Sequence, residues 1–236
     1  MDGILLFNKP VLWTSHDAVD FVRRRIGQAK VGHAGTLDPL ATGLLVILVG
    51  KATKWSQEFS GFDKDYSGSM TLGLVTDTED LEGRILEERD HGSVRKDLIL
   101  ELFSNLRGVH AQKPPAYSAV SRQGKRLYEW ARLGIAVETK EKEVTISEFQ
   151  LTGFELPEVY FSLTCSKGTY VRSLCSLVGQ RLGCGATLSS LVRDRVGRFT
   201  LTRALTEEEL IQASPESIES RLTGMDSHEN LLRSSE

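Results

Sequence analysis

The sequence predicts an α+β protein whose central sheet is mixed and mostly antiparallel. Strand-like and helix-like segments alternate irregularly over the 236 residues, and no internal repeat is present. Alternation of apolar with other residues is cleanest at Val159, Phe161, Leu163 and Cys165, which is typical of a strand. Hairpin signals between such segments favour antiparallel pairing.

The N-terminal elements follow from short patterns. Residues 3–8 are an apolar run and predict a buried strand. Ser15 is the expected N-cap of a helix that ends at Gly27. A polar, glycine-rich loop is expected over 32–43, and the apolar run 44–49 after it predicts a central strand.

Two elements are expected before residue 110. Residues 66–72 alternate as a strand does. Ser93 is expected to cap a helix that continues to about Leu106. The buried face of that helix should be formed by residues spaced four apart, namely Val94, Leu98 and Leu102.

Residues 110–142 have high charge and low apolar content, as expected for an insertion held away from the core. They contain a turn at Gln123-Gly124 and a predicted helix over 127–133. Beyond the strand at 159–165, a helix is expected from Tyr170 to Leu182.

The C-terminal part should hold two short helices. Thr206 and Glu209 form a capping box, and Ser214-Pro215 starts another helix. The last eight or so residues should be frayed.

Composition excludes several classes of protein. With 40% hydrophobic and 26% charged residues, the chain is neither disordered, nor collagen-like, nor a disulfide scaffold. The longest apolar run, 44–49, is too short to span a membrane, and no signal peptide is expected. The three cysteines show no CxxC spacing, which favours a cytoplasmic location.

Charge is distributed in blocks, although the formal net charge is only −3. Residues 107–140 carry seven positive and two negative side chains, and residues 167–203 carry seven and one. Residues 77–104 and 204–236 are acidic. The blocks indicate either one surface that faces a polyanion or ordinary solvated surface.

The densest motif is Gly32 to Gly43, GHAGTLDPLATG, with Asp38 at its centre. Asp before Pro is also a common turn element, so the residues alone leave a catalytic and a structural role open. The motif is not a phosphate-binding P-loop, because no GxxxxGK(S/T) pattern occurs. No histidine pair has metal-ligand spacing either, and no metal is expected.

With these motifs in order, the chain resembles the bacterial tRNA pseudouridine synthases of the TruB type from about residue 3 to about residue 200. Besides GHAGTLDPLATG, the similar segments are Lys64–Tyr66, Pro114–Ala119, Gly124–Tyr128, Ser166–Leu174 and Leu182–Ala186. The resemblance implies a pseudouridine synthase fold in residues 1–205, with 110–142 as a thumb-like insertion that clamps RNA. Residues 206–236 would be a short, acidic, helical tail.

Many members of this family continue into an RNA-binding module of the PUA type. Only 33 residues follow Arg203 here. The expectation is therefore a catalytic domain without that module.

The resemblance implies conversion of uridine to pseudouridine at position 55, in the T loop of tRNA, after the base is flipped out. The N1–C1′ bond breaks and a C5–C1′ bond forms, with no redox change, so no cofactor is expected. The partner is the tRNA T-arm stem-loop. We expect a monomer with no obligatory protein partner and no association with a membrane.

By similarity, Asp38 is the essential carboxylate. It would attack C1′, add to C6 of the base, or abstract a sugar proton to give a glycal, and the sequence does not choose among these routes. Arg172 would pair with Asp38 and keep it ionised. Tyr66 would stack on the uracil and lies where a proton must leave C5.

Further positions match family residues that bind RNA or support the site. His33 would occupy the place of the flipped base, Tyr170 and Leu191 would line the uracil pocket, and Lys9 with Pro10 would support the loop. The basic residues of the insertion that would meet phosphates are Arg122, Lys125, Arg126 and Arg132.

Two other functions use some of the same features. An RNA-binding chaperone would refold the tRNA elbow without catalysis, but it has no need of Asp38, Tyr66 and Arg172 together. A glycoside hydrolase acting on nucleosides needs two facing carboxylates, and the motif of Asp38 contains no second one.

Overall fold

The computed structural model describes residues 1–224, and the chain forms two compact units. The first unit contains Met1–Ser67 and the chain from Leu191 onward, and the second contains Gly68–Ser190. The two boundaries fall within the strands β4 (Lys64–Leu72) and β12 (Ala186–Val196). None of the described helices is long and apolar enough to cross a membrane.

The sheet of the first unit is centred on β3 (Thr42–Val49), whose residues 44–49 are completely buried. This burial explains the uninterrupted apolar run. β3 pairs antiparallel with β1 (Gly3–Lys9) and β2 (Val31–Ala34), and parallel with β12. A short strand, β13 (Phe199–Thr200), pairs antiparallel with the end of β12. The prediction of a mixed, mostly antiparallel sheet is confirmed.

The strand β2 corrects the expectation of a loop over the whole of 32–43. Gly32, His33 and Ala34 pair with Leu48, Ile47 and Val46 of β3. The segment has no strand-like alternation of its own, so its conformation comes from pairing with a strand already buried in the core. Only the stretch from Gly35 to Ala41 is loop.

The helix α1 (Ser15–Ile26) begins one residue earlier than expected, because Thr14 and not Ser15 is its N-cap. The Thr14 side chain accepts a hydrogen bond from the amide of Asp17, and the Asp17 carboxylate accepts one from the Thr14 amide. Of these two residues, only Thr14 has an acidic residue three positions later, as a capping box requires. The helix ends at Gly27, as predicted, in the left-handed conformation with φ 62°.

The remaining helices of the first unit are short. Those after β3 are the 3-10 turn η1 (Gly50–Trp55) and α2 (Ser56–Ser60). Near the C-terminus, η2 (Leu201–Arg203), α6 (Glu207–Gln212) and α7 (Pro215–Arg221) follow one another. The predicted capping box of α6 and the start of α7 at Pro215 are both confirmed.

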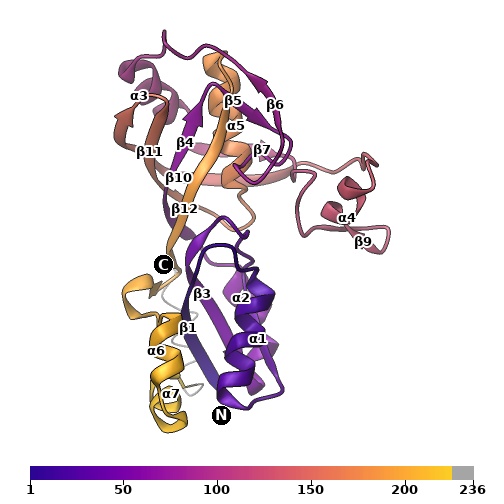
Figure 1. Ribbon diagram of the computed structural model, residues 1–236, viewed down its shortest axis with the longest axis vertical. Helices are drawn as coiled ribbons and strands as arrows, with labels where there is room; N and C mark the ends of the chain where they lie inside the picture. The colour runs from indigo at the N-terminus through magenta and orange to yellow at the C-terminus, as the bar shows by residue number, and fades with distance from the viewer. Residues whose placement is uncertain (225–236) are drawn as a thin grey trace. The chain divides into compact units, whose positions relative to one another are not determined.

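The segment after residue 205 packs onto the first unit. Leu205 and Thr223 form bridges with Phe7 and Ile4 of β1, and α6 and α7 lie beside this strand in Figure 1. The Arg25 guanidinium of α1 donates to the carbonyl oxygens of Leu210 and Ile211. The residues predicted to fray at the C-terminus lie outside the described part of the chain.

In the second unit the strand order is β12-β4-β11-β10-β7. Besides β12 and β4, this order contains β7 (Gly108–Gln112), β10 (Lys142–Glu155) and β11 (Glu158–Cys165). The four alternating residues of the predicted strand at 159–165 are all buried, which confirms it. A separate hairpin consists of β5 (Leu74–Thr76) and β6 (Ile85–Glu88).

The helix α3 (Lys96–Asn105) starts after Arg95, and Ser93 does not cap it. Its buried residues are Ile99 and Phe103, whereas Leu98 is exposed, so the predicted face is wrong. Phe103 stacks on Phe149 of β10 with ring centroids 3.7 Å apart. Two faces of this helix are apolar, and this stacking decides which one is buried.

The helix α5 (Val171–Leu182) confirms the prediction for this segment, with Tyr170 as its N-cap. Between β7 and β10 lies the insertion, which contains the hairpin β8 (Ser121–Arg122) and β9 (Lys125–Arg126) and the helix α4 (Leu127–Arg132). Figure 1 shows α4 and β9 standing away from the sheet of the second unit. Residues 110–112 belong to β7 and Lys142 to β10, so the part outside the sheet spans 113–141.

Candidate active site

Asp38 lies half-buried in the loop between β2 and β3, and the backbone of this loop is held at several points. The Asp38 carbonyl oxygen accepts a hydrogen bond from the amide of Ala41 at 3.1 Å. The carbonyl oxygen of Pro39 accepts one from the amide of Leu12 at 2.9 Å. These bonds connect the loop to itself and to the turn that follows β1.

Lys9 is completely buried at the end of β1. Its ammonium group donates to the carbonyl oxygens of Pro10, Trp13 and Pro39, at 3.0, 2.6 and 3.4 Å. A buried charge is tolerated only when its donors are satisfied in this way. Lys9 therefore ties the turn after β1 to the residue that follows Asp38.

Ser15 holds the other side of the loop. Its hydroxyl donates to the carbonyl oxygen of Leu37 at 3.0 Å and accepts from the Leu37 amide at 2.8 Å. This use of the hydroxyl is why Ser15 is not the cap of α1. The residue before Asp38 is thereby held through both of its backbone polar groups.

Arg193 of β12 is the third side chain that supports the loop, and it was not among the residues predicted from the sequence. Its guanidinium donates to the carbonyl oxygens of Gly35, Thr36 and Leu44, at 3.0, 3.3 and 2.8 Å. A Cβ at Gly35, where φ is +86°, would lie 3.5 Å from a guanidinium nitrogen. A Cβ at Gly43 would lie 2.6 Å from the Arg193 carbonyl oxygen. Gly43 thus allows the close approach of the Arg193 backbone, and the glycine content of the motif was the available signal of a close neighbour.

Tyr66 of β4 is buried, and the side chains on either side of it, Asp65 and Ser67, contact Arg195 and Asp194 of the neighbouring strand β12. Its phenol interacts electrostatically with the Arg193 guanidinium. Leu191, two residues before Arg193 on β12, is also buried. Tyr66 and Leu191 belong to the first unit, which also contains the Asp38 loop and Lys9.

His33 of β2 also lies in the first unit. Burial lowers the pKa of His33, and the positive charges of Arg193 and His16 act in the same direction, so the ring is neutral near pH 7. Within the described residues, its Nδ1 has no hydrogen-bond partner although it is buried.

Arg172, on the first turn of α5, is buried in the second unit beside Asp80. Its Nε lies 3.6 Å from an Asp80 carboxylate oxygen. It also donates to the carbonyl oxygens of Thr78 and Tyr117, at 2.7 and 2.8 Å. Asp80 was not among the residues predicted from the sequence. The acidic turn DTEDLEG, residues 77–83, was the available signal.

The same region holds Tyr170 and Glu79. The Gln112 side chain accepts a hydrogen bond from the Tyr170 amide at 2.8 Å and donates to its carbonyl oxygen at 3.0 Å. The Ser173 hydroxyl donates to the Glu79 carboxylate at 2.6 Å. Burial raises the pKa of Glu79, which the Ser173 hydrogen bond and the Arg172 charge oppose.

The basic residues of the insertion are spread over its hairpin and helix. Lys125 lies over the ring of Trp130, 4.9 Å from its centroid, and the Trp130 indole donates to the Arg122 carbonyl oxygen at 3.1 Å. The Arg126 guanidinium donates to the Ala119 carbonyl oxygen at 2.6 Å. Within the described residues, the buried Nε of Arg122 has no partner.

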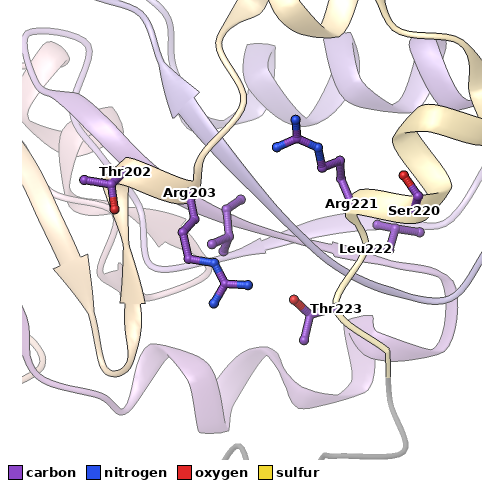
Figure 2. Close-up of a pocket in the computed structure, with 7 residues that line it drawn as sticks. Thr202, Arg203, Ser220, Arg221, Leu222 and Thr223 are labelled. Carbon is purple, nitrogen blue, oxygen red and sulfur yellow. The ribbon is translucent and has the colours of Figure 1, made fainter.

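Figure 2 shows a cavity of about 500 Å³ in the first unit, bounded by η2 and the end of α7. Arg203 extends toward Thr223, whereas Arg221 points away from it. None of the site residues predicted from the sequence lines this cavity. In the described part of the chain, no group of three or more His, Cys, Asp or Glu residues is arranged to hold a metal ion.

The family model described as TruB family pseudouridylate synthase (N terminal domain) matches residues 23–171. The chain belongs to the TruB family. This membership confirms the expected pseudouridine synthase fold.

Two TruB-family proteins illustrate the similarity over almost the whole chain. The tRNA pseudouridine synthase B of Opitutus terrae is 43% identical over 222 residues, covering 94% of this chain and 92% of that protein. The protein of the same name from Syntrophotalea carbinolica is 44% identical over 216 residues, covering 92% and 71%.

A solved structure shows the same fold. A chain in the crystal structure of a Cbf5-Nop10-Gar1 complex has a TM-score of 0.74 and 26% sequence identity to this TruB-family chain. The match covers 95% of this chain, which spans 60% of that one.

Proposed function

We propose that this chain converts uridine to pseudouridine at position 55, in the T loop of tRNA, with Asp38 as the catalytic carboxylate. The observation that carries the proposal is the bracing of the Asp38 loop by Lys9, Ser15 and Arg193, three polar side chains that are each nearly or completely buried. A loop held in this way keeps a carboxylate in place for chemistry on rigid support. The names of relatives that are 43–45% identical support tRNA as the substrate.

The reaction leaves the atomic composition of the substrate unchanged. The N1–C1′ bond breaks, the free base turns, a C5–C1′ bond forms, the C5 proton leaves and N1 takes up a proton. An ionised Asp38 would attack C1′, add to C6 of the base, or abstract a sugar proton to give a glycal. All three routes need the Asp38 carboxylate beside the glycosidic bond.

Arg172 is proposed to pair with Asp38 and to keep it ionised. Asp38 lies in the first unit and Arg172 in the second. The contacts of Arg172 with Asp80 and with the carbonyl oxygens of Thr78 and Tyr117 support this role, because they hold the guanidinium in one orientation.

Four residues are proposed to handle the flipped base. Tyr66 stacks on the uracil and accepts the proton from C5, while Tyr170 and Leu191 line the pocket. His33 fills the place that the base leaves in the T loop. A neutral, planar imidazole suits this position, because it stacks on bases without the desolvation of a charge.

The insertion is proposed to close over the T arm. Arg122, Lys125, Arg126 and Arg132 lie on its hairpin and helix and would contact phosphates. These contacts position the RNA, and the shape of the T loop is what the protein recognises. We further propose that the enzyme acts as a monomer, because one T arm needs one active site. We also propose a cytoplasmic location, which the three cysteines without CxxC spacing favour.

The deciding experiment uses an unmodified T-arm hairpin labelled with tritium at uridine C5. Wild type, Asp38→Asn and Asp97→Asn are incubated with it, Asp97 being an exposed carboxylate on α3. Tritium release by wild type and Asp97→Asn, but not by Asp38→Asn, is the expected result. If no protein releases tritium and all bind the hairpin, the proposal is wrong and an RNA chaperone replaces it.

A further inference from the structure

Arg193 is an unusual buried charge. Its side chain is among the largest that are completely buried, with 1% of the residue exposed. Among the described residues, no carboxylate forms an ion pair with it, whereas Arg172 and Arg195 have Asp80 and Asp65. A buried cation without an anion is costly, so its retention calls for an explanation in function.

The neighbours of the Arg193 guanidinium are carbonyl oxygens and one ionisable group. Three of its donors go to the carbonyl oxygens of Gly35, Thr36 and Leu44, which carry only partial charge. Tyr66 lies on β4 beside β12, between Asp65 and Ser67, whose side chains contact Arg195 and Asp194 of β12. Its phenol also interacts electrostatically with the Arg193 guanidinium. When Tyr66 is ionised, its phenolate supplies the anion that the buried guanidinium otherwise lacks.

We propose that Arg193 is a positioning residue that holds the Tyr66 oxygen against the Asp38 loop and stabilises the Tyr66 phenolate. This inference rests on the proposed function, in which Tyr66 accepts the C5 proton. In that step the phenolate oxygen takes the proton from C5, and the C–H electron pair returns to the uracil ring. The phenol then gives the proton to water, and the guanidinium stabilises the phenolate that re-forms.

Other charged groups surround this pair. Asp38 lies on the loop that Arg193 holds, and His33 lies on β2. On β4, Lys64 donates to the carbonyl oxygens of Ser60 and Phe62, and Asp65 is paired with Arg195. The Arg193 guanidinium is thus a cation that acts on Tyr66 from the neighbouring strand, and the Lys64 ammonium group donates to backbone oxygens.

The test compares single-turnover tritium release from the C5-labelled hairpin between pH 6 and pH 10. The proteins are wild type, Arg193→Gln, Arg193→Lys, Tyr66→Phe, the double variant of Arg193→Gln and Tyr66→Phe, and Arg195→Gln as a matched control. Arg195 is also a β12 arginine, but its guanidinium contacts Asp65 and the Gly197 carbonyl oxygen and not the loop.

At pH 7 we expect Arg193→Gln to be slower by about 100-fold, the lower range for loss of a general base. The deficit should shrink by at least about tenfold toward pH 10, where a phenol ionises without help. Arg193→Lys should lie between Arg193→Gln and wild type. The double variant should be no slower than Tyr66→Phe, because both changes disable one step.

Three results would overturn the inference. They are a deficit of the same size at every pH, additive losses in the double variant, or an equal deficit in Arg195→Gln. If Arg193→Gln does not fold, Arg193→Lys is tested with the same pH profile of tritium release. The ionisation of the Tyr66 phenol is also followed by ultraviolet absorbance, as the difference between each protein and Tyr66→Phe. A wild type that releases no tritium contradicts the proposed function instead.

Discussion

Ser15 and Leu37, 22 positions apart in the chain, exchange two hydrogen bonds through one hydroxyl group. Both residues are buried, so no water can replace either bond. Leu37 directly precedes Asp38, and the hydroxyl of a helix residue thereby sets the backbone of the loop. The position of the carboxylate depends on α1 as much as on the loop that carries it.

Replacing Ser15 with Ala should test this dependence. The Leu37 amide and carbonyl oxygen would lose their partner while buried, which costs about 1–3 kcal/mol of unfolding free energy. Urea unfolding measures this loss, and tritium release should fall roughly tenfold, since a shift of the carboxylate raises the barrier. Ser220→Ala removes an exposed helix hydroxyl and should change neither quantity. Equal behaviour of the two variants would contradict the structural role of Ser15.

Asp80→Asn should destabilise the protein more than any exposed carboxylate does. It removes the charge of one carboxylate that pairs with the buried Arg172 guanidinium, and breaking a buried pair costs about 3–5 kcal/mol. The control is Asp97→Asn, which removes an exposed pair with Arg95 that is worth less than about 1 kcal/mol. Urea unfolding compares the two. A loss at Asp80 as small as that at Asp97 would show that the Arg172–Asp80 pair contributes little to stability.

Leu12→Gly should stabilise the protein. Leu12 has φ 69° and is 74% exposed, so it stores backbone strain while burying little apolar surface. Glycine adopts this conformation without strain, and the gain should be about 1 kcal/mol. Leu12→Ala removes the same apolar surface but keeps the Cβ, and should give no gain. If thermal unfolding shows the same midpoint for both variants, strain at Leu12 is absent.

Glu79 should make stability depend on pH. Burial raises its pKa above the ordinary value of 4.5, so the folded protein binds its proton more tightly than the unfolded chain. The stabilising contribution of the proton is complete below pH 4.5 and is lost as the pH rises through the pKa of the folded state. Glu79→Gln stays neutral and still accepts the Ser173 hydrogen bond. Its unfolding free energy should therefore exceed that of wild type at neutral pH and fall less above pH 4.5.

The control for this prediction is Glu101→Gln, an exposed glutamate on α3. Unfolding free energies are measured in urea between pH 4 and pH 8. A wild-type profile that matches Glu79→Gln across this range would contradict the assignment to Glu79.

Several features could be predicted from the sequence because they depend on neighbours in the chain. The apolar run of β3, the alternation of β11, the glycine end of α1 and the capping box of α6 are local patterns. The family motifs are likewise contiguous, so the enzyme family and the candidate residues Asp38, Tyr66 and Arg172 followed from resemblance.

Other features required the tertiary structure. The strand β2 has no pattern of its own and forms because β3 offers it backbone partners. The buried face of α3 depends on Phe149, which lies more than 40 positions later in the chain.

The same reason explains which site residues the sequence did not reveal. Asp80 and Arg193 matter through contacts with Arg172 and with Gly35, residues about 90 and 160 positions away. Local patterns are set by the conformational preferences of adjacent residues and by periodic burial. Pairing, packing and the burial of charge are set by whichever distant segments the fold brings together, so only the tertiary structure decided them.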